Sequence, residues 1–475
     1  MYRMILVVIM AVVTFSCTPK HDSPKILGAW VGKLIVNENV SLRIGCEFKS
    51  ENDSIVATMA SIDQNVYGIE IDTLRIMGDS IKFSVNQMGV IYNGHFLTDT
   101  TIEGEFKQGS RPPLVLNFKK AESIPGAPPV RYQYPEKPYP YIENEVEFTS
   151  SISGFKLAGT LTTPKGAKKS AAVVLITGSG PNDRDETIWG HKVFLVLADY
   201  LTRRGITVLR MDDRGVGQSG GEYSTASMSD FADDASVALD YLKSRRDLNI
   251  GKVGIIGHSL GADIAPLVAN RNDVVDFVVL LAGAGIPLSE TIHMQTEHIY
   301  GIRGASKEAI DLNRRINQAV FDVAAQNIGL KEMQAAISQP FIELSEDLKN
   351  ISQEDKQKAE LPENLNPEDY YGFFTNNMRF DLFYNPSDQL RLLKQPILIL
   401  GGDLDTQVST SHNFPLMIAA LEESGNEDVT TKVFPNMNHL FQSCKTGEIE
   451  EYTQIGETMS PIVLKTISDW IGGLE

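Results

Sequence analysis

The first part of the chain alternates between apolar and polar residues over short runs, the pattern of β-strands that bury one face. Turn-forming pairs such as Gly78-Asp79 and Asn93-Gly94 separate these runs. We therefore predict that residues 25–120 form a small all-β domain, either a sandwich or a small barrel. The clearest runs are residues 40–44, 69–71, 80–85 and 114–118.

A different pattern begins at Val146, where a hairpin-like pair of strands is followed by strands that alternate with helices. Helices between successive strands indicate a mostly parallel sheet with helices on both faces, so the predicted fold class is α/β for residues 145–475. The expected strands are 172–177, 206–211, the run before Gly257, 277–281, 396–400 and 431–434, and the expected helices lie at 193–204 and 231–242.

The alternation is interrupted between Ile286 and Leu393. A connection of roughly a hundred residues is too long to be structureless inside a compact domain. Apolar residues recur there at helical spacing, which predicts a helical lid over the carboxyl ends of the strands. The residues of that apolar face are Leu312, Ile316, Ala319, Val320, Val323 and Ala324.

Residues 121–144 are predicted to link the two domains. Six prolines and four tyrosines fall between Pro125 and Tyr141, a composition typical of an extended, semi-rigid segment. The tyrosines could stack on a ligand, but aromatic residues in such a segment more often dock it onto a neighbouring domain, which is the interpretation we favour.

Composition and charge narrow the class of protein to which this chain can belong. The 475 residues are 42% hydrophobic and 22% charged, which suits a globular protein of two or three domains. The formal net charge is −18 and no basic block compensates it, which disfavours nucleic acid and anionic membrane surfaces as electrostatic partners. Cys46 and Cys444 fall in different predicted domains, and the sequence does not determine whether they pair.

Residues 1–17 have the features of an export signal. Arg3 precedes the apolar run Met4 to Phe15, which is too short to span a membrane as a stable helix. The following Ser16-Cys17 resembles the lipobox of bacterial lipoproteins, although Thr14 stands where that pattern usually has leucine. We expect a cell-envelope protein, periplasmic or at the cell surface, anchored through a lipid on Cys17; secretion with cleavage elsewhere and an uncleaved anchor remain alternatives.

The run Gly257-His258-Ser259-Leu260-Gly261 follows a predicted strand and precedes a predicted helix. This is the setting of a G-x-S-x-G nucleophile elbow, in which a sharp turn exposes the serine and the glycines let other backbone pass close by. Ser259 is the predicted nucleophile.

A serine hydroxyl needs a base within hydrogen-bond reach, and the base needs an acid. His439 follows the last predicted strand in a loop that can reach back over the sheet, whereas the other histidines are less suitably placed: His258 adjoins the serine and points elsewhere, and His191 precedes the elbow. Either Asp403 or Asp405, in a turn after a late strand, can serve as the acid.

The oxyanion of acyl transfer needs preorganised donors. The Leu260 N–H follows the nucleophile, and the Ser179 N–H lies in a glycine-rich turn after an early strand, so these two amides are the predicted oxyanion hole. The charged clusters at residues 183–186 and 212–217 are interpreted as scaffolding. No phosphate-binding loop and no metal-ligand set can be assembled, so no cofactor and no metal are expected.

In their order along the chain these motifs resemble those of α/β-hydrolases. More narrowly, residues 178–185, 405–408 and 438–441 look like those of exported bacterial carboxylesterases that carry an added N-terminal β-rich domain. The spacing from Gly402 to Asp405 resembles the acid loop of such enzymes. The resemblance implies a triad of Ser259, Asp405 and His439 that hydrolyses small-molecule esters through an acyl-enzyme.

Two alternatives remain. A serine peptidase of the prolyl-aminopeptidase kind would need acidic groups to hold a substrate ammonium, and Glu290, Glu297 and Glu308 lie in the lid. An inactive, anchored binding lipoprotein is the alternative from another class, and the intact set of candidate catalytic residues argues against it. Oligomeric state is left open by the sequence.

Overall fold

The computed structural model describes residues 25–474 except 37–39, 52–53, 65, 110, 128, 151–153 and 167–168, so the expected signal peptide at residues 1–17 lies outside the described part. The chain divides into two compact units, Met1–Pro128 and Pro129–Glu475. Within the described residues, no helix is long and apolar enough to cross a membrane.

The N-terminal unit is one antiparallel sheet of ten strands, in the order β4-β3-β2-β1-β10-β8-β7-β6-β5 with β9 beside β8. Its core is aromatic, with Trp30, Phe83, Tyr92 and Phe118 fully buried. The strands are β1 Gly28–Ile35, β2 Ser41–Glu51, β3 Ser54–Ser61, β4 Val66–Glu70, β5 Thr73–Met77, β6 Ser80–Val85, β7 Val90–Thr98, β8 Thr101–Gln108, β9 Leu114–Val115 and β10 Phe118–Ala121.

Two local predictions for this unit were wrong. Asn93-Gly94 lies inside β7 and forms no turn, because the glycine makes room for the neighbouring Tyr92 ring; a Cβ added there would lie 2.7 Å from that ring. The run 114–118, expected as one strand, is divided between β9 and β10, which pair with different parts of β8.

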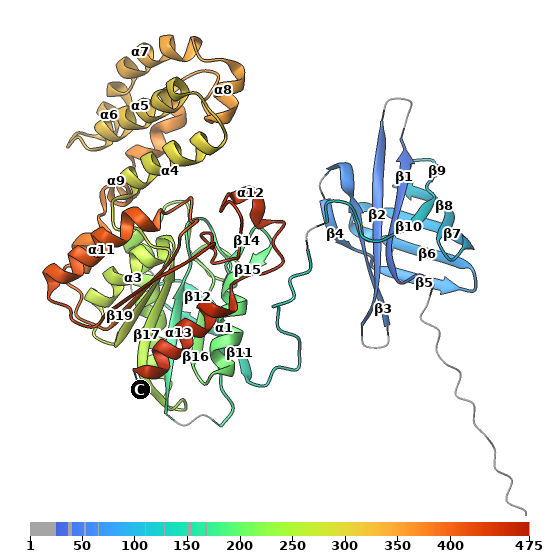
Figure 1. Cartoon of the computed structure of the whole chain (residues 1–475), viewed down its shortest axis with the longest axis horizontal. Helices are drawn as coiled ribbons and strands as arrows, with labels where there is room; N and C mark the ends of the chain where they lie inside the picture. Colours follow the sequence, from blue (N-terminus) through green and yellow to red (C-terminus); the bar gives the residue numbers. More distant parts are fainter. Residues whose placement is uncertain are drawn as a thin grey trace, which may run out of the picture. The chain divides into compact units, whose positions relative to one another are not determined.

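The second unit is built on an eight-stranded sheet in the order β11-β12-β16-β13-β17-β18-β19-β20 (Figure 1). Strand β12 is antiparallel to both of its neighbours, and the six strands from β16 to β20 run parallel. The strands are β11 Ile142–Thr149, β12 Lys156–Thr163, β13 Ser170–Ile176, β16 Thr207–Met211, β17 Ile250–His258, β18 Phe277–Leu281, β19 Ile397–Gly402 and β20 Val429–Phe434.

Helices cover both faces of this sheet, as the predicted fold class requires. Two separate apolar cores result, because the buried strands present side chains to both sides. One face packs α2 Met228–Ser244, α3 Leu260–Arg271 and α11 Thr410–Ser424, and the other packs α1 Val193–Arg203 and α13 Pro461–Gly473 (Figure 1). A short hairpin of β14 Thr187–Ile188 and β15 His191–Lys192 precedes α1, and α12 Ile449–Tyr452 precedes α13.

The insertion after β18 is helical and has a core of its own, coloured yellow to orange in Figure 1. Of the predicted apolar face, Leu312, Ile316 and Val320 are buried in that core and Ala319 is half-buried. The lid consists of α4 Leu288–Ile302, α5 Lys307–Ala324, α6 Leu330–Ala336, α7 Ser338–Lys349, α8 Gln353–Lys358, the 3-10 segment Pro367–Phe374, α9 Asn376–Phe383 and α10 Pro386–Leu390.

Part of the segment expected to be a linker packs onto the second unit. The Gln133 side chain donates to the Met459 carbonyl at 2.7 Å, and the buried Tyr141 donates its hydroxyl hydrogen to Asp199 at 2.9 Å. The second unit therefore begins at Pro129, upstream of the expected residue 145.

Candidate active site

Ser259 lies in a strained turn between β17 and α3. Its φ is +53°, a region that non-glycine residues rarely adopt, and the turn is possible because the flanking glycines allow close backbone contacts. A Cβ added to Gly257 would lie 2.1 Å from the Gly261 carbonyl oxygen, and one added to Gly261 would lie 2.2 Å from the Ile176 carbonyl oxygen. The structure thus contains the nucleophile elbow that the motif predicts.

Asp405 and His439 meet at the carboxyl ends of β19 and β20. His439 Nδ1 donates to Asp405 Oδ2 at 2.7 Å, and the aspartate side chain is 0% exposed. The other carboxylate oxygen accepts from the amides of Gln407 at 2.9 Å and Val408 at 2.8 Å. These three donors stabilise the buried carboxylate, which in turn fixes the tautomer of the imidazole.

Asp403, the other candidate acid, is placed differently. Its side chain is exposed and accepts from the Asn436 amide at 2.6 Å, a turn contact of the kind expected for the acid that does not face the histidine. Among the described residues, Nε2 of His439 has no hydrogen-bond partner, so this nitrogen is available to a serine hydroxyl.

The loop after β13 lies against the elbow. A Cβ added to Gly178 would lie 3.2 Å from Ser259 Cβ, so the loop backbone passes directly beside Ser259. In the described part of the chain, the amides of Ser179 and Leu260 donate to no protein group. Both predicted oxyanion donors are therefore free to bind a ligand oxygen.

Asn182 fixes the conformation of this loop. Its side-chain amide donates to the carbonyls of Gly178 at 3.1 Å, Ser179 at 3.2 Å and Gly180 at 2.9 Å, and its own N–H donates to Asp213 at 2.9 Å. Because one side chain collects three successive carbonyls, the loop is held in shape without using its remaining amides.

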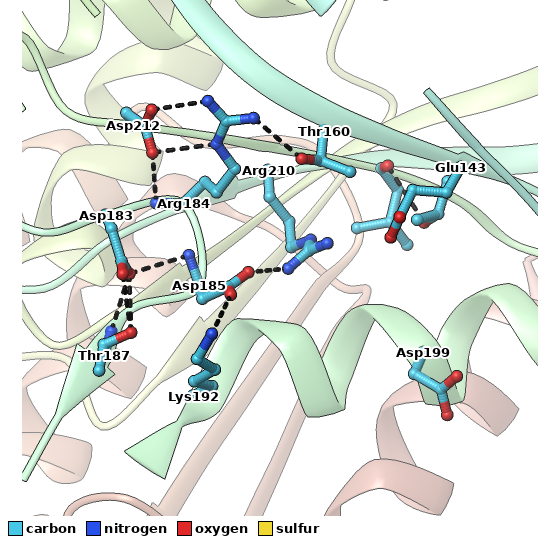
Figure 2. Close-up of polar contacts among 12 residues, drawn as sticks. Glu143, Thr160, Asp183, Arg184, Asp185, Thr187, Lys192, Asp199, Arg210 and Asp212 are labelled. Atoms are coloured by element: carbon cyan, nitrogen blue, oxygen red, sulfur yellow. Dashed lines mark hydrogen bonds and ion pairs between the residues drawn. The ribbon is translucent and has the colours of Figure 1, made fainter. Parts of the chain in front are cut away.

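The charged cluster after this loop forms a network of ion pairs and hydrogen bonds (Figure 2). Arg184 makes a bidentate pair with Asp212, with distances of 3.0 and 2.7 Å, and Asp185 pairs with Arg210 and, at 3.2 Å, with Lys192. Such pairs join the loop to the ends of β16 and α1, which is the scaffolding role expected for these residues.

Two buried residues of the site were not recognised from the sequence. Glu186 was assigned to the scaffolding cluster and His258 was regarded as a neighbour of the serine that points elsewhere, yet the Nδ1 of His258 lies 2.9 Å from Glu186 Oε1. The two residues are 72 positions apart, so no local spacing connects them.

Other titratable groups near the site have shifted pKa values. Burial raises the pKa of Asp213 to about 7, although its hydrogen bonds from Thr177 Oγ1 and the Asn182 amide oppose the shift. Burial lowers the pKa of His191 to about 4, and its ring nitrogens contact Thr458 Oγ1 and the Tyr452 carbonyl oxygen. Among the described residues no group of three or more His, Cys, Asp and Glu side chains could hold a metal ion.

A groove of about 530 Å³ separates the lid helix α4 from the acid loop. Glu297 and His298 line it on the lid side, and Thr406 and Gln407 line it on the sheet side. Gln295 on α4 donates to the Gln407 carbonyl at 2.9 Å, which connects the lid to the loop that holds the acid. The other two acidic lid residues considered from the sequence, at positions 290 and 308, are exposed and do not line this groove.

Two family models and several known proteins match parts of this chain. The sequence model of the family described as "Serine aminopeptidase, S33" matches residues 190–327, which include Ser259, and that of the "Prolyl oligopeptidase family" matches residues 335–457, which include Asp405 and His439. The esterase EstD of Thermotoga maritima is 30% identical over 329 residues, which are 69% of this chain and 66% of that protein.

Shorter or more distant similarities are also found. An acyl transferase of Photobacterium leiognathi is 31% identical over 140 residues, 29% of this chain and 41% of the transferase. An esterase structure from Pyrococcus furiosus is 18% identical, with a TM-score of 0.42 over 73% of this chain and 97% of that one. The chain thus spans 66% of the length of the first curated relative and less than half of the second.

The order of the eight strands, the elbow after β17 and the helical insertion after β18 define an α/β-hydrolase fold with an added all-β unit. The chain belongs to the α/β-hydrolase superfamily. Within that superfamily its sequence is similar to the serine aminopeptidase and prolyl oligopeptidase families and to the Thermotoga esterase.

Proposed function

We propose that this protein is a serine hydrolase that cleaves carboxylic esters by way of an acyl-enzyme. The observation that supports this most strongly is the buried 2.7 Å contact between His439 Nδ1 and Asp405, at the same edge of the sheet as a serine held at φ +53°. A base oriented by an acid is the arrangement that activates a nearby serine hydroxyl. The similarity to an esterase adds support.

The proposed reaction has two steps. Ser259 Oγ attacks the ester carbonyl carbon while His439 Nε2 takes the hydroxyl proton, and the amides of Leu260 and Ser179 stabilise the oxyanion. The intermediate collapses, the alcohol leaves with the proton from His439, and Ser259 remains acylated. His439 then takes a proton from water, whose oxygen attacks the acyl carbon. The bond from that carbon to Ser259 Oγ breaks as His439 returns the proton to Oγ, and the carboxylic acid is released. Asp405 stabilises the imidazolium in both steps.

A peptidase is the second candidate, and the descriptions of the two matching families favour it. In this reading the exposed carboxylate of Glu297, in the groove beside Thr406 and Gln407, would bind the ammonium group of a peptide. The E297Q variant should then lose turnover of aminoacyl anilides but keep turnover of uncharged esters.

The test uses the purified protein with p-nitrophenyl esters from acetate to long acyl chains and, in parallel, an aminoacyl-anilide panel. We expect ester turnover, and we expect Ser259→Ala to lower kcat by about 10⁴-fold or more without unfolding the protein, because the nucleophile acts as a unit with its base. Anilide turnover alone would favour the peptidase. Unchanged ester turnover in Ser259→Ala would contradict both candidates.

A further inference from the structure

Glu186 and His258 form a buried contact beside the nucleophile that the proposed reaction does not use. Their side chains are 0% and 1% exposed. Glu186 Oε1 lies 2.9 Å from His258 Nδ1 and also accepts from the Gly178 amide at 2.7 Å. His258 Nε2 lies 3.0 Å from the main-chain carbonyl oxygen of His439.

The contact between His258 Nε2 and the His439 carbonyl places one ring proton of His258. A carbonyl oxygen can only accept, so Nε2 of His258 carries a hydrogen that it donates to His439. Glu186 Oε1 already accepts from the Gly178 amide. When Glu186 is ionised, Oε1 accepts from Nδ1 as well, so both ring nitrogens carry hydrogens and the pair is an imidazolium with a carboxylate.

Each member of the pair is joined to a different part of the active site. Gly178 directly precedes Ser179, one of the candidate oxyanion donors, and His258 directly precedes Ser259 in the elbow. The third contact is to the backbone of His439, whose ring centroid lies 5.0 Å from that of His258. One ion pair therefore joins the oxyanion loop, the nucleophile and the base, which come from three distant parts of the chain.

We propose that Glu186 and His258 are positioning residues: their ion pair sets the oxyanion loop and the backbone of His439 in fixed relation to Ser259. This inference rests on the proposed function, because it concerns the same site. Neither residue is assigned contact with substrate. Their effect is geometric, and displacement of reacting groups by about 1 Å can cost roughly 10²-fold in rate.

The electrostatics of the pair agree with its geometry. Burial lowers the pKa of His258, but the charge of Glu186 and the hydrogen bonds to Glu186 and to the His439 carbonyl outweigh burial, so the pKa lies above its ordinary value of 6.5. Besides Glu186, the groups that face this ring are the imidazole of His439 and the carboxylate of Asp405.

The test compares Glu186→Gln with Asp185→Asn, a matched carboxylate in the same segment that pairs with Arg210 and Lys192 but touches neither Gly178 nor His258. The readouts are kcat and KM for the best ester and the rate of labelling by a fluorophosphonate probe. We expect E186Q to lower kcat and labelling by about 10- to 100-fold with little change in KM, less than the outright loss of an oxyanion donor. D185N should lower kcat less than E186Q does, because it leaves both contacts of Glu186 in place.

The inference is overturned if E186Q keeps kcat within about twofold, or if D185N lowers kcat as much as E186Q, since the carboxylates then only support the loop. Labelling of the wild type that disappears in Ser259→Ala tests the proposed function separately. Should E186Q fail to fold, a pH titration of the wild-type imidazole protons by NMR decides. The ion pair predicts a titration midpoint for His258 above the ordinary 6.5, and a midpoint at or below 6.5 refutes it.

Discussion

Asp405 and Glu186 are both buried carboxylates, and the protein stabilises them in different ways. Asp405 receives hydrogen bonds on both oxygens, from His439 and from two main-chain amides. Glu186 receives both of its contacts on Oε1, and within the described structure Oε2 is buried without a partner. A carboxylate with one bare oxygen depends on a nearby cation, so Glu186 depends on the charge of His258 more than Asp405 depends on that of His439.

This dependence predicts how stability varies with pH. The folded-state pKa of His258 is raised above 6.5, so the stabilisation that it provides is fully present below about pH 6.5 and is lost as the pH rises through the folded pKa. We expect the difference in unfolding midpoint between wild type and Glu186→Gln to shrink as the pH increases from 6 to 9. Thermal unfolding at several pH values measures it, and a difference that does not change with pH would contradict the ion pair.

At the residue scale the sequence indicated the candidate residues of the site but not the contacts that support them. The elbow motif placed Ser259, and the loop after the last strand placed His439. Asp403 and Asp405 occupy one turn, and which of them faces the histidine is decided by backbone geometry that spacing does not reveal. Glu186 could not be connected to a partner 72 residues away, because only the tertiary fold brings the two together.

At the scale of elements, the elbow is a packing unit as well as a turn. Helix α3 begins so close to the end of β13 that a side chain on Gly261 would overlap the Ile176 carbonyl, at 2.2 Å. Since backbone cannot yield as a flexible side chain does, the glycine determines how near the helix approaches the sheet. The position of the Leu260 amide follows from that approach.

Alanine substitutions at two helical glycines, one in α3 and one in α4, test whether this close approach requires a glycine. Gly261→Ala should lower the free energy of unfolding by about 1–3 kcal/mol or more through overpacking. Gly301→Ala, in the exposed part of α4 with no atom within 4 Å of the added Cβ, should be neutral or stabilising by about 0.5–1 kcal/mol. Denaturant unfolding of both variants measures the sign of the change in the free energy of unfolding. Equal effects would show that helix propensity, and not the close approach, governs the elbow.

Periodicity predicted elements well where burial is uniform. Strand β18 and strand β6 begin and end at the predicted residues. A continuous apolar run fits a strand buried on both faces, and an alternating run fits a strand buried on one face. Prediction was wrong at Asn93-Gly94, where a typical turn pair lies within a strand to accommodate Tyr92. A tertiary contact overrode the local turn preference there.

At the scale of the whole molecule, each unit has its own apolar core and the boundary falls after Pro128. The residues that follow the boundary make hydrogen bonds that stabilise the second unit. Gln133 is bonded to the segment before α13, and Tyr141 is bonded to α1. Composition alone indicated a linker, because proline and tyrosine content does not show where an extended segment docks.

Two truncated chains test whether the segment of residues 129–144 stabilises the second unit or only links the two units. A chain of residues 129–475 should fold and keep the ester turnover of the full protein, whereas residues 145–475 should unfold at a lower temperature. The shorter chain loses several hydrogen bonds at about 1 kcal/mol each, and it also loses the buried Tyr141 ring. Calorimetry of both chains measures the difference, and identical midpoints would mean that the docked segment contributes nothing to stability.

The part of the lid from α5 to α9 has a core that is separate from the two cores of the sheet, whereas Leu390 of α10 belongs to a core of the sheet. Substitutions among the residues of this separate lid core can therefore accumulate with little loss of stability in the sheet. Such independence makes the lid the region in which descendants of this sequence can acquire new substrate preferences while the elbow and its supporting pair stay unchanged.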